Sequence, residues 1–325
     1  MKRITAIILI AAACMVAASP AQCRKKTKEQ PLRILYWNIQ NGMWHDQGNN
    51  YDNFVKWVGE QNPDICVWCE AKSRYRTGTA EKMTDEFERY LCSNWDELAA
   101  RYGHSYVYVG GEGDTFPQVI TSKYPIRNVK RIVGEPGRLL VSHGCGWAQV
   151  DVNGRTINIV TLHTWPQKYA YLTAPEDQKA NAEAKGGDRY RAAEVQYIVE
   201  HTFKTVPGAE DQLWMMLGDF NAISRVDNYH YGLPEDATDF LTHDYVLQNT
   251  PYIDVIAEKH PGEYHSSTLS GRRIDIIYMT RPLYDMVTSA EIPTDGWVTL
   301  TRDKALRQFC HPSDHRPVIV DLMIK

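Results

Sequence analysis

The stretch Leu213-Trp214-Met215-Met216-Leu217-Gly218-Asp219-Phe220-Asn221 decides the fold, because an apolar run in it ends abruptly in polar residues. Five consecutive apolar residues predict a short buried β-strand. Gly218, Asp219 and Asn221 follow at its exit. Taken alone, they are equally well explained as a turn that stops the strand, since Gly, Asp and Asn all favour turns. The interpretation therefore depends on whether other strands end in the same way.

Further apolar runs along the chain also carry polar side chains at their borders. Asn38 follows Ile34–Trp37, and His163 follows Ile157–Leu162. The residues found at such borders are Asn38, Glu70, His163, Asp314 and His315, and a further acid, Asp275, lies on an apolar strand. Rigid strand ends position functional groups better than free loops. Several strands bordered by acids, amides and imidazoles therefore predict one polar rim of a sheet.

These residue types suit hydrolysis of a phosphate ester. Carboxylate and amide oxygens bind hard cations such as Mg²⁺, Mn²⁺ or Ca²⁺. Such a cation polarises a phosphoryl group and neutralises its developing charge. An imidazole exchanges a proton near neutral pH, and a neighbouring aspartate fixes its tautomer.

Each residue also has a purely structural explanation. Asn38 could be a turn residue before Asn41-Gly42, and Asp314-His315 could cap the start of a strand. His163 alone is more typical of a hydrogen-bonded core histidine. Asp275 is the hardest to explain in this way, because a carboxylate on an apolar strand is unfavourable unless it is paired.

Five segments, taken together, resemble the endonuclease/exonuclease/phosphatase superfamily of DNase I-like phosphoesterases. They occur in the same order as in the family and extend from Leu35 to Val318. The segments are Leu35-Tyr36-Trp37-Asn38-Ile39, Asp64-Ile65-Cys66-Val67-Trp68-Cys69-Glu70, Leu217-Gly218-Asp219-Phe220-Asn221-Ala222, Arg273-Ile274-Asp275-Ile276-Ile277-Tyr278 and Ser313-Asp314-His315-Arg316-Pro317-Val318.

The resemblance implies an α+β fold in which two packed mixed β-sheets are flanked by helices, a four-layer α/β/β/α sandwich. The site would lie at one edge of this sandwich. The resemblance also implies a divalent metal, Mg²⁺ or alternatively Mn²⁺ or Ca²⁺. Glu70 would be its main ligand, supported by Asn38 and Asp314.

The catalytic roles that the resemblance implies fall on five residues. Asp219 would orient or deprotonate the attacking water, and Asn221 would hold a phosphate oxygen. His315 would contact the scissile phosphate and be steered by Asp275. His163 matches a second histidine of the nuclease and sphingomyelinase branches.

The N-terminus is typical of an exported protein. Residues 1–21 combine Lys2 and Arg3 with an apolar run and small residues, which predicts a signal peptide. Residues 22–31 are expected to form a tether, and 32–325 a single domain. Lipid attachment at Cys23 or Cys14 is the alternative to cleavage after Ala21. We expect a periplasmic or extracellular location.

Composition limits the class of partner. The chain is 43% hydrophobic and 23% charged, as in ordinary globular proteins. Its formal net charge of −4 becomes −6 without Lys2 and Arg3. A chain that is not basic overall is a poor candidate for tight, processive binding of nucleic acid, although a nuclease is not excluded.

The cysteines are expected to be structural. Cys66 and Cys69 have C-x-x-C spacing, but they lie in a predicted strand. Residues three apart in a strand face opposite sides, so the two sulfurs cannot easily share a metal.

Periodicity predicts strands and helices interleaved along one domain, without repeats. The expected helices are Asn53–Gln61, Met83–Tyr102 and Arg189–Thr202. Expected strands include Leu32–Trp37, Ile65–Trp68, Tyr106–Val109, Val119–Thr121, Gly146–Val152, Thr156–His163, Arg273–Met279 and Val318–Ile324. Trp165–Gly187 is expected to be a long insertion or loop.

The sequence therefore predicts an exported phosphoesterase, monomeric and without an obligate protein partner. The substrate would be a nucleic acid or a phospholipid headgroup, as in nucleases or sphingomyelinase-like phosphodiesterases. An inositol- or sugar-phosphate phosphatase is an alternative. A catalytically silent binding module on the same fold is another.

Overall fold

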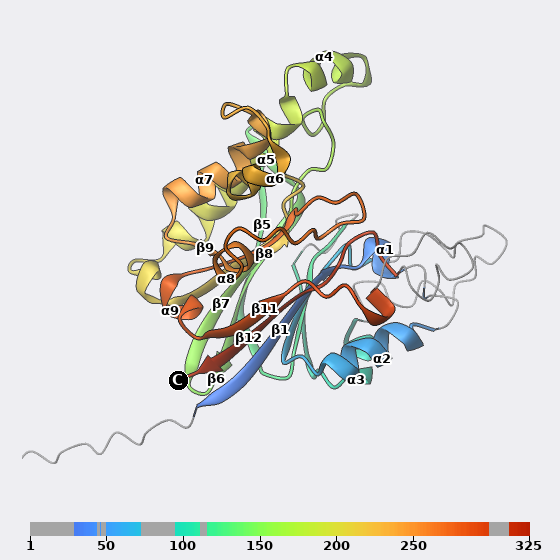
Figure 1. The fold of residues 1–325 in the computed structure, drawn as a ribbon, viewed down its shortest axis with the longest axis vertical. Helices are drawn as coiled ribbons and strands as arrows, with labels where there is room; N and C mark the ends of the chain where they lie inside the picture. Colours follow the sequence, from blue (N-terminus) through green and yellow to red (C-terminus); the bar gives the residue numbers. More distant parts are fainter. Residues whose placement is uncertain (1–28, 44–45, 47–49, 73–94, 111–115, 299–311) are drawn as a thin grey trace, which may run out of the picture.

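The computed structural model describes residues 29–43, 46, 50–72, 95–110, 116–298 and 312–325, which form two packed β-sheets with helices on their outer sides (Figure 1). Each sheet has six strands. The predicted four-layer architecture is confirmed.

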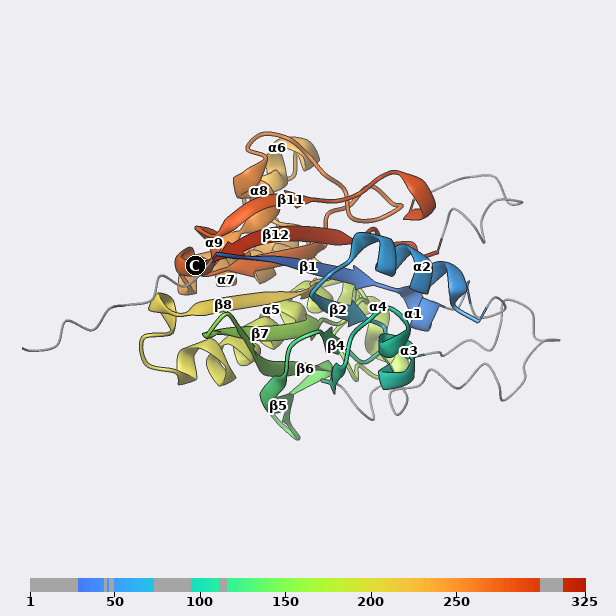
Figure 2. The same cartoon turned by 90° about the horizontal axis from the view of Figure 1, so that it is seen from below.

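The first sheet has the strand order β11-β12-β1-β2-β4-β3, and Figure 2 shows β11, β12 and β1 side by side. The strands are β1 (Gln30–Asn38), β2 (Ile65–Cys69), β3 (Tyr106–Val109), β4 (Val119–Ser122), β11 (Val287–Glu291) and β12 (Val318–Ile324). β1 is parallel to β2 and antiparallel to β12. Gln30 and Pro31 pair with Ile324 and Met323, so these two residues belong to the sheet and not to the predicted tether.

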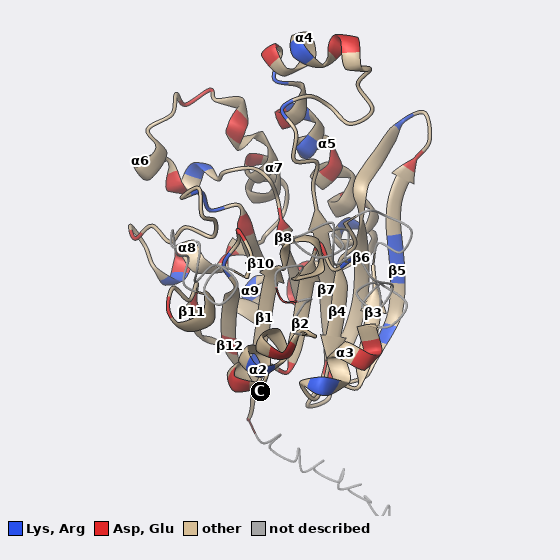
Figure 3. Ribbon diagram, turned by 90° about the vertical axis from the view of Figure 1, so that its right-hand side faces the viewer, with Lys and Arg blue, Asp and Glu red and all other residues tan. Residues whose placement is uncertain are grey.

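The second sheet has the order β5-β6-β7-β8-β10-β9. The strands are β5 (Ile126–Glu135), β6 (Leu139–Val152), β7 (Arg155–His163), β8 (Leu213–Asp219), β9 (Ile253–Asp254) and β10 (Asp275–Met279). β7 is parallel to β8, which is antiparallel to β10. The sequence patterns did not predict β5, an edge strand that exposes most of its residues and carries Arg127, Lys130 and Arg131 (Figure 3).

Three apolar clusters separate the four layers. Tyr36 and Val67 of the first sheet meet Ile159 and Leu217 of the second in the central cluster. The opposite face of the first sheet packs against α2 (Asp52–Gln61) and α3 (Trp95–Arg101). The opposite face of the second sheet packs against α5 (Gly186–His201) and α7 (Leu241–Asn249). Figure 1 shows these two helix pairs on opposite sides of the sheets.

The remaining α-helices of the described residues are short, and none of the described helices is both long and apolar enough to span a membrane. They are α1 (Gln40–Met43), α4 (Gln178–Glu183), α6 (Asn228–Tyr231), α8 (Val255–Lys259) and α9 (Arg281–Tyr284). The predicted loop Trp165–Gly187 contains α4 and the start of α5. Of the helix predicted over Met83–Tyr102, α3 lies at its C-terminal end, and residues 83–94 lie outside the described residues.

The two cysteines of β2 face opposite sides of the sheet, as predicted. Cys69 lies in the central cluster, whereas Cys66 lies in the cluster under α2 and α3. Both are buried free thiols, and burial raises the pKa of each well above its ordinary value. Neither is therefore suited to act as a thiolate ligand or nucleophile.

Candidate active site

Strand pairing brings the predicted residues to one edge of the sandwich. In the second sheet, Asp219 is directly opposite His163 of β7 and Asp275 of β10. In the first sheet, Asn38 pairs with Cys69, and Glu70 is the next residue. Parallel pairing aligns the exits of neighbouring strands, so the amides and acids gather at one rim.

Gly218 allows β7 and β8 to approach each other at this rim. A Cβ atom on Gly218 would overlap the carbonyl oxygen of Leu162. Any larger residue would push β8 away from β7 and displace Asp219 from His163. Glycine is therefore required here by a close backbone approach and not by a turn.

Asp275 and His315 form a buried hydrogen-bonded pair. The Asp275 carboxylate is fully buried, and its Oδ2 lies 2.7 Å from Nδ1 of His315. Ser267 Oγ donates to the same Oδ2 over 2.7 Å, and Tyr36 Oη donates to Oδ1 over 2.8 Å. Since Asp275 is held from three directions, it fixes the imidazole with Nε2 3.7 Å from Asp219 Oδ2.

Charge in this pair favours the protonated ring. Burial alone lowers the pKa of His315, but Asp275 and then Asp219 act against it and raise the pKa well above its ordinary value. His315 is thus a cation near neutral pH, with Nε2–H available as a donor. An imidazolium at this position can hold an anionic oxygen.

Asn38 links the two carboxylates at the centre of the site. Its Nδ2 donates to Asp219 Oδ2 over 3.0 Å and to Glu70 Oε1 over 3.2 Å. Its Oδ1 accepts the N–H of Gln40 over 3.0 Å, which fixes the orientation of the amide. In this orientation the Asn38 side chain donates to both acids and positions them. A metal ion bound by Asn38, as the sequence predicts, would have to share Oδ1 with the N–H of Gln40.

Glu70 lies just beyond β2 in a left-handed conformation, with φ of 55°. The backbone N–H of Asn41 donates to its Oε2 over 2.9 Å. Burial raises the pKa of Glu70, opposed by the positive charge of His315. A carboxylate whose pKa is raised by burial gains from a nearby cation.

Asp219 is buried between the other groups. Burial raises its pKa to about 7, with His315 opposing and Asp275 adding to the rise. Its Oδ1 accepts the backbone N–H of Asn221 over 2.8 Å. A carboxylate with a pKa near the ambient pH is suited to accept a proton.

His163 on β7 and Asp275 on β10 flank Asp219 on its two sides. The Nε2 atom of His163 lies 3.7 Å from Asp219 Oδ2. Its ring packs against that of His143, with a centroid distance of 4.4 Å. Burial, followed by the influence of His143 and His315, lowers the pKa of His163 well below its ordinary value. His163 is therefore neutral where His315 is charged.

Asn221 and Asp314 lie at the border of the site. Asn221 Nδ2 donates to the carbonyl oxygen of Thr164 over 3.0 Å, so this nitrogen is engaged by the backbone. The Asp314 side chain is half-exposed, and its Oδ1 lies 4.0 Å from Nε2 of His315. The phosphate-holding role of Asn221 and the metal-binding role of Asp314 stay predictions.

Sequence reasoning missed three side chains that support the site: Tyr36, Ser267 and His143. Tyr36 lies within an apolar strand and looks like an ordinary core residue. Ser267 lies in a polar loop without a motif. The one available signal was Asp275 itself, since a buried carboxylate needs donors that the sequence does not identify.

The donor chemistry of the site fits a divalent cation. Glu70, Asp219 and Asp275 face a single charged imidazole, His315, so negative charge is in excess. Asp219, Asp275 and His315 have candidate ligand atoms within 4.8 Å of one another. However, hydrogen bonds already engage Asp275 and Nδ1 of His315. Glu70 lies at the partly exposed border of the site, whereas Asp219 and Asp275 are buried, so its carboxylate is the most accessible of the three acids to a hard cation.

Comparison with solved structures confirms the fold. No sequence-family model and no curated protein sequence matches the chain. Solved structures with the same fold include an endonuclease/exonuclease/phosphatase family protein from Bacteroides thetaiotaomicron, with a TM-score of 0.57 and 14% identity over 92% of this chain and 99% of that one. The human Nocturnin catalytic domain has a TM-score of 0.59 and 15% identity over 90% and 93%. An AP endonuclease from Archaeoglobus fulgidus has a TM-score of 0.57 and 16% identity over 89% and 98%. The chain thus has the fold of the endonuclease/exonuclease/phosphatase family.

Proposed function

We propose that this chain is an exported, divalent-metal-dependent phosphoesterase that hydrolyses a phosphate diester with an activated water. The observation that carries the proposal is the buried His315–Asp275 pair, held beside Asp219 and next to Glu70. The reaction needs a charged donor, a proton acceptor and a ligand for a cation. His315 is the charged donor, Asp219, with a pKa of about 7, is the proton acceptor, and Glu70 is the ligand.

The residues divide the work according to their charge. Asp219, with a pKa of about 7, accepts the proton of the attacking water. His315 donates its Nε2–H to a non-bridging phosphate oxygen, and Asp275 keeps the ring charged and oriented. Asn38 holds Asp219 and Glu70 at a fixed separation. Glu70 would bind Mg²⁺, Mn²⁺ or Ca²⁺, and such a cation supplies charge neutralisation at the phosphoryl group.

The substrate that we favour is a diester, in a nucleic acid or a phospholipid headgroup. His163 supports this choice, because the resemblance places such a second histidine in the nuclease and sphingomyelinase branches. A neutral imidazole 3.7 Å from Asp219 is available for hydrogen bonding to a second oxygen substituent of the phosphorus atom. The AP endonuclease among the structural neighbours acts on a nucleic acid, which is consistent with this class.

Two alternatives use the same fold. A phosphatase for inositol or sugar phosphates would prefer a phosphomonoester. A catalytically silent binding module would turn over neither. The intact set of acids and histidines favours an enzyme, and we expect it to act as a monomer.

The test is hydrolysis by the mature protein of plasmid DNA, a choline phosphodiester and a chromogenic phosphomonoester, with Mg²⁺, Mn²⁺ or Ca²⁺. We expect the protein to hydrolyse a diester, and we expect EDTA to abolish this hydrolysis. His315→Ala removes a charged donor to the transition state and should reduce the rate about 10²–10⁴-fold.

The matched control is His201→Ala, which removes a partly exposed histidine of α5 that packs on Tyr197. This variant should retain wild-type activity. Preference for the monoester would favour the phosphatase, and inactivity on all three substrates with no bound metal would favour the binding module.

A further inference from the structure

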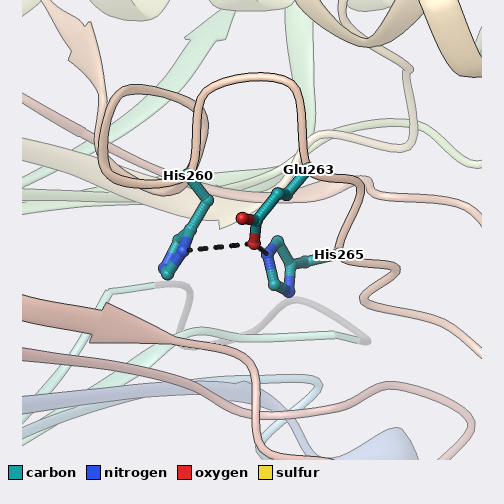
Figure 4. Close-up of side chains that lie close together, drawn as sticks. All are labelled: His260, Glu263 and His265. Carbon is teal, nitrogen blue, oxygen red and sulfur yellow. Dashed lines mark ion pairs between the residues drawn. The ribbon is translucent and has the colours of Figure 1, made fainter.

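A second group of potential metal ligands lies outside the catalytic site, in the segment between α8 and β10. His260, Glu263 and His265 come from the short sequence His260-Pro261-Gly262-Glu263-Tyr264-His265. Gly262 has φ of 79°, a left-handed conformation that turns the chain back on itself. As a result the three side chains converge (Figure 4).

Distances within this group are too long for hydrogen bonds and suit a bridging ion. Glu263 Oε2 lies 3.6 Å from His265 Nε2 and 3.9 Å from His260 Nδ1. All three ligand atoms lie within 4.8 Å of one another. Ligands about 2.0–2.1 Å from a tetrahedral zinc ion are separated by about 3.3 Å, so only a small closure is needed.

The two imidazoles are prepared for coordination. His260 Nε2 lies 2.7 Å from the carbonyl oxygen of Ala290, which can only accept, so this nitrogen carries the proton. Nδ1 is therefore the ring nitrogen left to bind a metal, and it lies 3.9 Å from Glu263 Oε2. A carbonyl that fixes the tautomer in this way is the usual outer partner of a metal-binding histidine. Nε2 of His265 is shielded from solvent and has no hydrogen-bond partner among the described residues.

We propose that His260 Nδ1, His265 Nε2 and the Glu263 carboxylate bind one Zn²⁺ ion, with a fourth position left for water. Two imidazoles and one carboxylate suit zinc, whereas Mg²⁺ and Ca²⁺ prefer sites made of oxygen ligands. The site therefore differs in metal preference from the acidic catalytic site at Glu70.

The ion would cross-link the segment between α8 and β10, which leads into the catalytic site. Ser267, two residues after His265, donates to Asp275 Oδ2, and His260 is bonded to β11 through Ala290. Zinc would join both ends of this segment to a common centre. We expect its main effect to be thermal stability, because an ion that binds only the folded state stabilises that state.

The experiment measures zinc binding to metal-free protein that carries Glu70→Gln, so that the catalytic cation site is weakened. Calorimetric titration with Zn²⁺ should give one site per chain, and Co²⁺ should give the visible absorption bands of a four-coordinate ion. Zn²⁺ should also raise the melting temperature. If Glu70→Gln does not fold, the titration uses the wild-type protein saturated with Mg²⁺.

Adding His265→Ala or Glu263→Gln should weaken Zn²⁺ binding by about 100-fold or more, since even loss of an outer partner costs about 10–100-fold. Both side chains are partly exposed, so the variants should melt like their parent without zinc. His201→Ala, at a partly exposed histidine elsewhere, should bind zinc normally. Unchanged Zn²⁺ affinity in the His265→Ala protein, or equal competition by Mg²⁺, would overturn the proposal. The readout is binding, so the result is independent of whether the protein hydrolyses any ester.

Discussion

One buried histidine is hydrogen-bonded to a β10 side chain near each end of the strand, and the pKa values of the two rings are shifted in opposite directions. At the first residue of the strand, Asp275 accepts from His315. Three residues further along, Tyr278 Oη lies 2.8 Å from Nδ1 of His243 on α7, whose other nitrogen meets the Ala222 carbonyl oxygen. The pKa of His315 is raised well above its ordinary value, whereas burial lowers that of His243 to about 4.

The difference shows what creates the charge of the site. Both rings are buried, and burial lowers the pKa of each. Hydrogen bonds to a hydroxyl and a carbonyl do not offset that effect, but the carboxylates beside His315 do. The nearby carboxylates, Asp275 first and then Asp219, therefore distinguish the charged imidazole of the site from a neutral core histidine.

The largest effect is expected from Asp275→Asn. The amide keeps the shape of the side chain but removes the charge that contributes most to the raised pKa of His315, so this pKa should fall. Hydrolysis should then fall about 10²–10⁴-fold, the range of a lost acid–base group. The pKa of His315 can be read from its imidazole resonances in an NMR titration.

Asp321→Asn is a suitable control, because it changes an aspartate of β12 that pairs with Arg33 away from the site. It should leave the rate unchanged. An Asp275→Asn protein in which His315 still titrates as in the wild type would show that Asp275 does not hold the charge.

The next largest effect concerns stability at acid pH, through His243→Gln. The pKa of His243 in the folded protein is about 4, below the value of about 6.5 in the unfolded chain. The unfolded state therefore binds a proton first, so the stability from His243 is complete above about pH 6.5 and is lost as the pH falls toward 4. This loss amounts to about 3 kcal/mol.

Glutamine does not titrate, so the free energy of unfolding of the variant should fall less between pH 7 and pH 4, by about that amount. Urea unfolding at both pH values measures the difference. Equal losses in the two proteins would mean that His243 is not kept neutral by burial.

The smallest effect is expected from a matched pair of tyrosines, Tyr36 and Tyr278. Tyr36→Phe removes a donor to Asp275, and Tyr278→Phe removes the partner of His243. A hydrogen bond to a charged group contributes about 1.5–3 kcal/mol, so Tyr36→Phe should reduce the rate about 10–100-fold. Tyr278→Phe should lower the melting temperature and leave the rate intact. Equal rates in the two variants would remove Tyr36 from the support of Asp275.

The sequence predicted a site residue wherever a polar side chain stands at the border of an apolar strand or within one. Polar residues at the borders of apolar runs predicted Asn38, Glu70, Asp219 and His315 at one rim, because strand order and period place such borders together. Asp275 was informative because an apolar strand seldom carries a carboxylate.

Other features could not be predicted because they depend on the three-dimensional arrangement and leave no recognisable pattern in the sequence. β5 lacks an alternating pattern, since an edge strand that exposes most of its residues has little apolar requirement. Tyr36 and Ser267 reach Asp275 across 239 and 8 positions of the chain. The direction of the Asn38 amide depends on the Gln40 backbone and so appears only in three dimensions.

The central claim, that a cation bound by Glu70 lies beside the His315–Asp275 pair, is tested most directly by anomalous diffraction from crystals grown with Mn²⁺ and inorganic phosphate. The account predicts a manganese peak bonded to the Glu70 carboxylate, with a phosphate oxygen accepting from His315 Nε2. A structure with manganese elsewhere and none at Glu70, or with phosphate out of reach of His315, would contradict it.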